Sequence, residues 1–247
     1  MGKYVFYGYR GVPAAEKRRL VHEHFETIAN RYDLADHILS FGLHLFWRRR
    51  AMKRLGLKCG ATVLDLCTGT GDLAILAAKD VGPSGRIVGC DLSQAMMAAG
   101  RRKVARAGFV ERLAWVRADA ECLGFARDSF DAVLVGYGLR NFVFLEQGLR
   151  EICRVLKPSG RFLAMEFALP ESAWLRTLYH WYSFRVLPRA GQLITGVAEP
   201  FEYLAESIRV FPQARQIRIA LQRNGLTNVS SERLSKGLAV LYYAEKS

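Results

Sequence analysis

DLCTGTGD, the stretch from Asp65 to Asp72, decides the fold of this 247-residue chain. It begins at the end of a β-rich run, Thr62–Leu66, and opens a helical segment, Gly71–Lys79. Its two glycines let the backbone turn tightly and approach a ligand without a Cβ in the way. The helix that follows presents free N–H groups and the positive end of its dipole. The stretch therefore predicts a strand–turn–helix unit that binds a nucleotide-like ligand, with a plain tight turn as the alternative.

Strands and helices alternate around and beyond this stretch. The predicted strands are Thr62–Leu66, Arg86–Cys90, Leu113–Arg117, Ala132–Gly136, Arg161–Glu166 and a closing hairpin of Val229–Leu234 and Leu238–Ala244. The predicted helices between them are Gly71–Lys79, Ser93–Ala107 and Phe144–Leu156. Such alternation is typical of a parallel sheet with helices on both faces. We predict a Rossmann-like α/β fold with a mostly parallel seven-stranded sheet and an antiparallel C-terminal hairpin.

Two helical regions lie outside the alternation. Residues 1–55 are predicted to form an N-terminal helical cap, broken near residues 40–42, and residues 56–247 to form the ligand-binding domain. In the cap, Leu43, Trp47, Ala51 and Leu55 recur at spacings of four and share one helix face. Residues 170–211 interrupt the larger domain with aromatic-rich helices just before the closing hairpin. An insertion at that place is suited to be a lid over the substrate.

The charge around the glycine turn distinguishes between two adenosine-containing ligands. Gly69-x-Gly71-x-x-Ala74 also matches the spacing of a dinucleotide fingerprint. However, Asp65 lies four residues before Gly69, at the end of the predicted strand. A carboxylate there repels a diphosphate and attracts the cationic amino group of a methionine moiety. The turn therefore favours S-adenosylmethionine over NAD.

Acidic residues also follow the next two predicted strands. Asp91 lies twenty residues after Gly71, where its carboxylate can accept hydrogen bonds from both ribose hydroxyls. Asp119 follows the third strand, where it can accept from the adenine amino group. A single acid at a strand end is often only a helix cap. Three acids at successive strand ends are harder to explain structurally, and they predict S-adenosylmethionine as the cofactor with no metal ion.

Several further segments resemble the ubiquinone/menaquinone biosynthesis C-methyltransferases, from about His22 to the C-terminus. They are Tyr32–Asp36, Ser40–His44 with Trp47, Phe130–Asp131, Gly138–Asn141, Arg154–Gly160, Tyr182–Phe184, Leu187–Arg189 and Tyr203–Arg209. The resemblance implies transfer of a methyl group to a ring carbon of a prenylated quinol. It also implies that residues beside the glycine turn line the cofactor site. The complete predicted cofactor site is Asp65, Gly69, Thr70, Gly71, Asp91, Leu92, Asp119, Ala120 and Gly136.

The chain departs from the family pattern at several positions. Ala35 and Asp36 stand where the family usually has Met-Asn, and Ser159 replaces a usual glycine. Phe142–Phe144 stands where Val-Thr-Asp is common, and the closing hairpin ends in Tyr-Ala-Glu instead of a basic ending. These departures leave the benzoquinol or naphthoquinol head group of the substrate open.

Four residues are predicted to act on the quinol. A ring carbon becomes nucleophilic when a neighbouring hydroxyl loses its proton, so the protein must stabilise a phenolate and align it with the methyl group. Arg140, a permanent cation after the fourth predicted strand, suits that oxygen, with an ion pair to Glu166 or Asp131 as the alternative. Asn141 can orient the quinol or cap a helix. Tyr32 and His44 are candidate proton acceptors, with packing on the N-terminal helices as their alternative role.

Three other functions are alternatives to quinol methylation. A nucleic-acid methyltransferase is disfavoured, because residues 136–141 contain no proline where base N-methyltransferases usually have an Asn/Asp-Pro-Pro-aromatic segment. We therefore expect no nucleic-acid partner. Phospholipid N-methylation remains an alternative hypothesis for the enzymatic activity. A catalytically silent adenosyl-binding scaffold is disfavoured by the intact Gly69, Gly71, Asp91 and Arg140.

Composition bears on the location of the protein. The five cysteines are odd in number and form no C-x-x-C pair, which fits a reducing cytoplasm. No apolar run is long enough to span a bilayer, and the net charge is +13. We expect a cytoplasmic protein that docks on anionic membranes to collect its substrate, and a homodimer is left open. The predicted docking residues are Arg48, Arg49, Arg50, Lys53 and Arg54 with Trp174, Tyr179 and Trp181.

Overall fold

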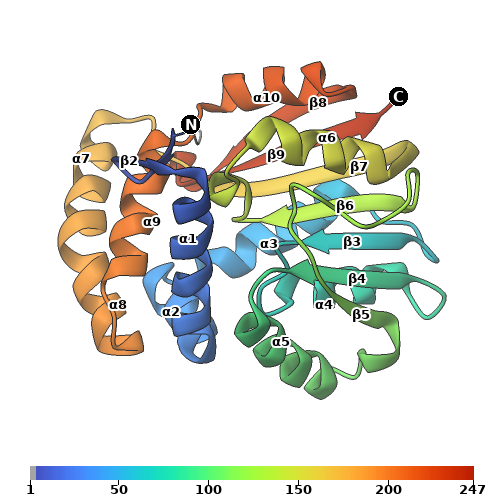
Figure 1. The fold of residues 1–247 in the computed structure, drawn as a ribbon, viewed down its shortest axis with the longest axis horizontal. Helices are drawn as coiled ribbons and strands as arrows, with labels where there is room; N and C mark the ends of the chain where they lie inside the picture. Colours follow the sequence, from blue (N-terminus) through green and yellow to red (C-terminus); the bar gives the residue numbers. More distant parts are fainter. Residues whose placement is uncertain (1–3) are drawn as a thin grey trace.

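The computed structural model describes residues 4–247 and contains a seven-stranded sheet in the order β5-β4-β3-β6-β7-β9-β8 (Figure 1). The strands are β3 (Thr62–Leu66), β4 (Arg86–Asp91), β5 (Leu113–Arg117), β6 (Phe130–Gly136), β7 (Leu156–Phe167), β8 (Leu226–Leu234) and β9 (Ala239–Lys246). β3 to β7 are parallel, whereas β9 is antiparallel to both β7 and β8. The predicted fold class is confirmed, and β3 and β5 have the bounds that their sequence predicts.

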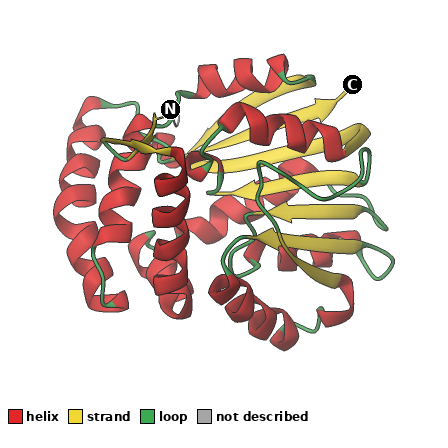
Figure 2. Cartoon of the chain, in the orientation of Figure 1, coloured by secondary structure: helices red, strands yellow, loops and turns green. Residues whose placement is uncertain are grey.

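Helices cover both faces of the sheet (Figure 2). α6 (Leu145–Val155) and α10 (Ala214–Arg223) pack on the face that carries Leu64 and Leu66 of β3. The opposite face carries Val63 and is covered by α3 (Leu43–Leu55), α4 (Asp72–Val81) and α5 (Gln94–Arg106). Successive side chains of a strand point to opposite faces, so β3 supplies apolar side chains to both cores, Val63 to one and Leu64 and Leu66 to the other.

The predicted apolar stripe of α3 is confirmed, because Trp47, Ala51 and Leu55 are buried in the core of the second face. α3 therefore packs on the sheet itself, although it belongs to the segment predicted as a cap. The boundary of that cap at residue 55 stays a prediction.

The remaining helices gather at the end of the sheet toward which the parallel strands point (Figure 1). From the N-terminal segment come α1 (Ala14–Ile28), the 3-10 turn η1 (Ala29–Arg31) and α2 (Tyr32–Leu39). From the insertion come α7 (Ala173–Trp181), the π-helical turn η4 (Tyr182–Val186), α8 (Leu187–Thr195) and α9 (Glu199–Val210). Short 3-10 turns complete the chain, namely η2 (Val110–Arg112), η3 (Leu139–Asn141) and η5 (Ser235–Gly237).

A small antiparallel hairpin, β1 (Tyr4–Tyr7) and β2 (Arg10–Pro13), precedes α1 and was not predicted from the sequence. It is held by tertiary contacts. The buried ring of Tyr7 stacks on Tyr203 of α9 with 4.5 Å between centroids, and the Tyr9 amide donates to the Glu206 carboxylate at 3.0 Å. The hairpin thus joins the N-terminal segment to the insertion above the ligand-binding end of the sheet.

Candidate active site

The glycine turn connects β3 to α4 at the point where the strand order reverses, which is where open α/β sheets bind ligands. Gly69 has φ +54° and Gly71 has φ +80°, in the left-handed region that glycine adopts without a steric penalty. Gly71 caps the N-terminus of α4. The two glycines therefore shape the turn that the sequence predicts.

Asp91 holds this turn in place. Its Oδ2 accepts a hydrogen bond from the Gly69 amide at 2.8 Å, and its Oδ1 accepts from the Ser93 amide at 2.9 Å. Burial raises the pKa of Asp91, and these backbone hydrogen bonds oppose the rise. Each carboxylate oxygen has a second acceptor position, so Asp91 can still receive ribose hydroxyls.

Asp65 provides a direct test of whether the site fits S-adenosylmethionine. Its side chain is only 1% exposed, and its Oδ2 accepts from the Thr68 hydroxyl at 2.6 Å. Its Oδ1 is buried and makes no hydrogen bond of normal geometry among residues 4–247, although the Ala74 backbone amide is close enough to the carboxylate to lower its pKa. Burial raises the pKa of Asp65 to about 7, and the Thr68 hydrogen bond opposes the rise. An unpaired buried acceptor costs free energy, so a cationic amino group placed against it would be stabilising.

The structure brings the other predicted cofactor residues to the same place. One pocket, on the side expected for the adenosyl moiety, and a smaller adjoining one at the glycine turn share Gly69 and Gly136. Asp91, Leu92, Asp119 and Ala120 line the first pocket, whereas Asp65 and Thr70 line the second. Gly71 lines neither, and its role lies in the turn itself.

The N-terminal helix α1 forms part of the first pocket. Arg18 Nε is 3.1 Å from Asp119 Oδ2, and Arg18 Nη2 is 3.2 Å from the buried carboxylate of Glu121. At the other end of the helix, Glu26 accepts from the Ala95 amide at 3.2 Å. The Asp119 side chain that is expected to meet adenine therefore also anchors α1 over the pocket.

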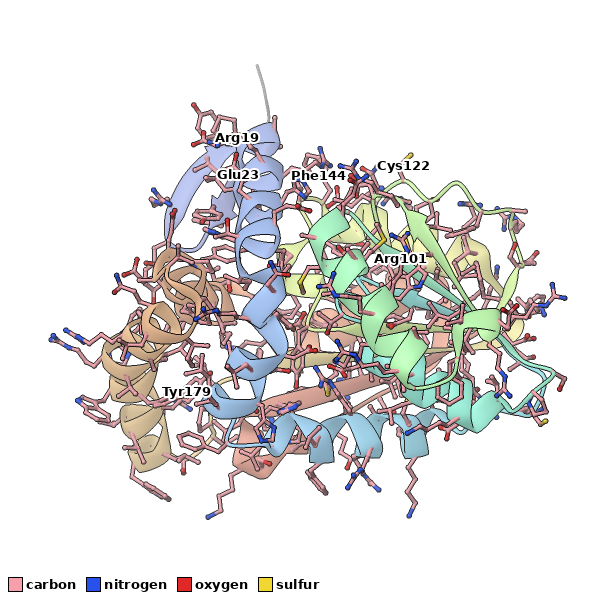
Figure 3. All side chains as sticks on the ribbon, turned by 90° about the horizontal axis from the view of Figure 1, so that it is seen from below. Arg19, Glu23, Arg101, Cys122, Phe144 and Tyr179 are labelled. Carbon is pink, nitrogen blue, oxygen red and sulfur yellow. The ribbon has the colours of Figure 1, made fainter. Side chains whose placement is uncertain are left out.

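A second, larger cavity of about 390 Å³ adjoins the cofactor pockets and lies between α2 and the helices of the insertion. Its walls are mostly apolar and aromatic, and Tyr179 of α7, labelled in Figure 3, is one of the lining residues. Tyr32 is the residue that lines this cavity as well as both cofactor pockets. Cofactor pockets lined by several aspartates and an apolar acceptor cavity therefore meet at Tyr32. We call the 390 Å³ space the acceptor cavity.

Arg140 lines the acceptor cavity and is also ion-paired. Its Nη1 is 2.9 Å from Glu166 Oε2, and its backbone amide donates to Glu166 Oε1 at 3.2 Å. Its Nε is buried and has no partner within the described part of the chain. Burial raises the pKa of Glu166, and Arg140 opposes the rise. Of the two alternative ion-pair partners, Glu166 is the one observed, because Asp131 pairs with Lys157 at 2.8 Å.

The other three predicted catalytic residues differ in position. Asn141 lines the cofactor pocket, and its Oδ1 accepts from the Tyr203 hydroxyl at 3.1 Å. The Tyr32 hydroxyl makes no hydrogen bond with any residue from 4 to 247, and burial raises its pKa. His44 is buried, its Nδ1 lies 2.6 Å from the Ser40 hydroxyl, and it lines neither the cofactor pockets nor the acceptor cavity. The geometry supports a role at the site for Asn141 and Tyr32 but not for His44.

One residue of the predicted membrane-docking set was wrongly placed on the surface. Arg48 is only 7% exposed, and it pairs with Asp36 at 2.9 Å and with Asp72 at 2.8 Å. Its guanidinium joins α3 to α2 and α4 beneath the site. The helical spacing placed Arg48 off the apolar stripe, but spacing cannot reveal that two carboxylates from other helices meet it there.

Sequence reasoning missed other residues of the site. Asp36 lines the acceptor cavity, and its position four residues after Tyr32 on one helix was the signal that could have identified it. Arg18 and Tyr203 reach the site from segments far away in the sequence, and no local pattern identifies them.

Comparison with known proteins agrees with this geometry. The family model described as the ubiE/COQ5 methyltransferase family matches residues 13–246. The chain is 38% identical to the ubiquinone/menaquinone biosynthesis C-methyltransferase UbiE of Francisella tularensis subsp. novicida, over 97% of this chain and 96% of that one. It is 39% identical to UbiE of Blochmanniella pennsylvanica, over 97% and 94% of the two chains.

Solved structures share the fold at low sequence identity. Phosphoethanolamine N-methyltransferase 2 of Haemonchus contortus, in complex with S-adenosyl-L-methionine, has a TM-score of 0.67 at 16% identity, over 96% of this chain and 62% of that one. An S-adenosylmethionine-dependent methyltransferase of Thermotoga maritima has a TM-score of 0.64 at 17% identity, over 92% and 100%. The match to the family model over almost the whole length, and the near-complete coverage of relatives above 35% identity, give the conclusion: the chain belongs to the ubiE/COQ5 methyltransferase family.

Proposed function

We propose that this enzyme transfers the methyl group of S-adenosylmethionine to a ring carbon of a prenylated quinol in ubiquinone or menaquinone synthesis. The observation that carries the proposal is that the aspartate-containing cofactor pockets and the apolar acceptor cavity meet at Tyr32. The quinone-pathway names of the relatives support the same acceptor class. A sulfonium methyl is already strongly electrophilic, so the chemistry lies in activating and orienting the acceptor.

Arg140 is suited to stabilise the acceptor once it has lost a proton. It is a permanent cation among apolar walls, where a charge interacts more strongly than it does in water. Its Nη1 donates both to Glu166 Oε2 and to the Tyr137 carbonyl, and its Nε has no partner among the described residues. We propose that this guanidinium binds the phenolate oxygen and stabilises its negative charge. Asn141, on the cofactor side, would help to orient the ring.

Activity on three acceptors tests the proposal. The purified enzyme should methylate a reduced quinone with a short prenyl tail, in the presence of S-adenosylmethionine, and should leave phosphatidylethanolamine and RNA unmodified. Methylation of phosphatidylethanolamine alone would show that the acceptor cavity binds a phospholipid and that the enzyme is a phospholipid N-methyltransferase. Binding of S-adenosylmethionine without transfer to any of the three would favour a scaffold.

We also propose that the enzyme works at the inner, cytoplasmic surface of a membrane, because a prenylated quinol resides in the bilayer. None of the helices within residues 4–247 has the length and apolarity needed to cross a membrane. The lining of the acceptor cavity includes apolar side chains that are also exposed to solvent, namely Phe41 at 78%, Trp181 at 58% and Leu178 at 52% exposure. Exposed aromatic groups around a cavity suit the interface between water and lipid.

Exposed cations lie on the neighbouring elements α3 and η5. Phe46, Arg49 and Lys53 are exposed at spacings of three and four, so they share the outer face of α3. Lys236 of η5 lies 5.9 Å from the ring of the exposed Trp174 of α7. The docking surface that we propose consists of Phe41, Phe46, Arg49, Lys53, Trp174, Leu178, Trp181 and Lys236. Four residues of the docking set predicted from the sequence are omitted. Arg48 is buried, Arg50 pairs with Glu232 at 2.7 Å, Arg54 donates to the Ser230 hydroxyl at 3.0 Å, and Tyr179 lines the acceptor cavity.

A further inference from the structure

Lys17 is a buried cation beside the active site. It lies on α1, is only 7% exposed, and its ammonium group donates to the Phe142 carbonyl at 2.7 Å. Phe142 directly follows η3, the turn that carries Arg140 and Asn141. Burying a charge costs free energy unless the charge is hydrogen-bonded and balanced by an opposite one. The fold therefore maintains this contact between α1 and the turn against a desolvation cost.

Glu121 supplies the balancing charge from the segment after β5. Its carboxylate is buried, and its Oε1 accepts hydrogen bonds from the Phe144 amide at 3.0 Å and from the Val143 amide. Its Oε2 accepts from Arg18, the neighbour of Lys17 on α1, at 3.2 Å. These two amides and the carbonyl that Lys17 holds belong to three consecutive residues. Lys17 and Glu121 therefore fix the backbone just after η3.

The turn η3 is also held from two other directions. Glu166 of β7 binds the Arg140 guanidinium at 2.9 Å, and the Tyr203 hydroxyl of α9 donates to Asn141 Oδ1 at 3.1 Å. Those partners act on the two side chains that we assign to the acceptor. Lys17 acts on the backbone where the turn ends, so it completes the set of restraints.

The helix α1 meets both halves of the active site. The residues of α1 that line the first cofactor pocket are Arg18, Val21, His22 and Phe25. The same helix reaches the acceptor-binding turn through Lys17. A displacement of about 1 Å in a reacting group can cost about 10²-fold in rate. The contact between α1 and the turn therefore bears on methyl transfer as well as on the shape of the cofactor pocket.

We propose that Lys17 is a positioning residue that holds the Arg140–Asn141 turn in place for methyl transfer, an inference that rests on the proposed quinol methylation. Lys17 lines neither the cofactor pockets nor the acceptor cavity, so it acts through the turn. Without its hydrogen bond the turn shifts, and the guanidinium no longer meets the phenolate oxygen in the best geometry. Asp65 and Asp91 stay in place, so the loss belongs in kcat.

The charge of Lys17 gives this role a pH signature. Burial lowers the pKa of Lys17 to about 8, and Glu121 opposes the fall. The other charged groups at this end of α1, Arg18 and Asp119, pair with each other at 3.1 Å. Above pH 8 the neutral amine can still donate, but its hydrogen bond loses the assistance of the charge. The contribution of Lys17 to turnover should therefore fall as pH rises through about 8.

The contribution of Lys17 to stability has the opposite sign. In the unfolded chain Lys17 titrates at the higher pKa of an ordinary lysine, so the unfolded state binds more protons between pH 8 and that value. The unfolding free energy from this group therefore rises with pH over the same range. A lysine with a structural role only would raise stability there without lowering turnover, so the two measurements separate the two roles.

The test compares the purified wild-type enzyme with Lys17→Met on a reduced quinone with a short prenyl tail. We expect kcat to fall by about 10²-fold, with the affinity for S-adenosylmethionine measured by calorimetry falling much less. Lys17→Arg should restore part of the rate. Because Lys17→Arg keeps its charge, its turnover relative to the wild type should rise above pH 8. That ratio cancels the titration of the acceptor hydroxyl, which both enzymes share.

A double variant tests whether Lys17 acts through the turn. In an Arg140→Lys background the group that Lys17 positions is already altered, so Lys17→Met should cost much less than it does in the wild type. Arg19→Met is the matched control on the same helix. Arg19 is exposed and pairs with Glu23 at 2.9 Å, and both are labelled in Figure 3. That control should keep wild-type kinetics.

Four outcomes would overturn the assignment. They are near-normal kcat in a folded Lys17→Met protein, equal fractional losses in the wild-type and Arg140→Lys backgrounds, a wild-type pH profile that matches that of Lys17→Arg, and wild-type kinetics lost in Arg19→Met as well. If Lys17→Met does not fold, the pH profiles of the wild type and Lys17→Arg decide alone. Absence of quinol methylation by the wild-type enzyme would overturn the proposed function itself, and is distinguishable from these four results.

Discussion

The cofactor half and the acceptor half of the active site are built in different ways. The cofactor half consists of short turns at the ends of adjacent strands, and Asp91 there binds backbone amides only two and twenty-two residues away. The acceptor half joins α2 to helices of the insertion, as where the Tyr182 hydroxyl donates to the Leu39 carbonyl at 2.7 Å. Polar hydrogen bonds within residues 65–93 shape the glycine turn, with α1 added over it, whereas the acceptor cavity is lined mainly by apolar side chains from segments distant in the sequence. Substitutions should therefore separate binding of the cofactor from methylation of the acceptor.

The substitution with the largest expected effect on methylation, at little cost to cofactor binding, lies in the acceptor half. Arg140→Lys keeps the charge but loses the planar array of donors, so kcat on a reduced quinone should fall by about 10²–10³-fold. The dissociation constant of S-adenosylmethionine should change little, because Arg140 does not line the cofactor pockets. Steady-state kinetics and calorimetry on the same preparation measure the two quantities.

A second variant at the ion-pair partner of Arg140 separates loss of stability from loss of catalysis. Arg140→Met alone leaves Glu166 buried without its cation, which costs about 3–5 kcal/mol of unfolding free energy. Arg140→Met with Glu166→Gln should recover much of that stability while turnover stays low. Recovery of turnover together with stability would assign Arg140 to a structural role.

The next largest effect belongs to the cofactor half. Asp91→Ala removes a carboxylate that holds Gly69 and Ser93 and is expected to bind the ribose. Charge-assisted hydrogen bonds of this kind contribute about 1.5–3 kcal/mol, so the affinity for S-adenosylmethionine should fall by roughly 10–150-fold. Asp80→Ala, on the exposed end of α4, is the matched control. Unchanged affinity in a folded Asp91→Ala protein would remove Asp91 from the binding site.

A smaller effect concerns pH. The ionised form of Asp65 is the one that attracts the amino group of the cofactor, and burial raises the pKa of Asp65 to about 7. Affinity for S-adenosylmethionine should therefore rise by up to about tenfold per pH unit below pH 7, with release of a proton on binding. In the unliganded protein the same group lowers the unfolding free energy as pH rises from the ordinary carboxyl pKa to about 7. Calorimetry in buffers of different ionisation enthalpy measures the proton.

Asp65→Asn provides the comparison, because it removes the titrating group and should flatten both pH dependences. A variant that binds more weakly but keeps the wild-type slope would show that another group takes up the proton.

The smallest effect concerns the docking surface beside the acceptor cavity. One basic residue near an anionic membrane contributes about 1 kcal/mol, so Lys53→Gln should weaken binding to anionic vesicles about fivefold at low salt. Lys79→Gln, an exposed lysine near the end of α4, should have little effect. Sedimentation with vesicles of anionic and of neutral lipid measures both variants. Equal binding of the wild-type protein to the two lipids, or binding to neither, would reject the docking surface.

The elements that were predicted correctly share a physical basis. Thr62–Leu66 is a strand with those bounds because a central strand, covered on both faces, is a short run of β-prone residues, and the edge strand Leu113–Arg117 also carries such a run in Trp115 and Val116. The positions of the three acids followed from the rule that parallel strands present their carboxyl ends at one edge. The β1–β2 hairpin escaped prediction, since Tyr7 and Tyr9 depend on partners in α9.

The sequence by itself determined the periodicity, the turn chemistry and the family motifs, and with them the fold class and the cofactor site. Only the tertiary structure decided that Arg140 pairs with Glu166, that Arg48 is buried between Asp36 and Asp72, and that Asp36 faces the acceptor cavity. The reason is physical. Backbone conformation responds mainly to nearby residues, whereas burial and ion pairing depend on which distant side chains the packing of helices brings together.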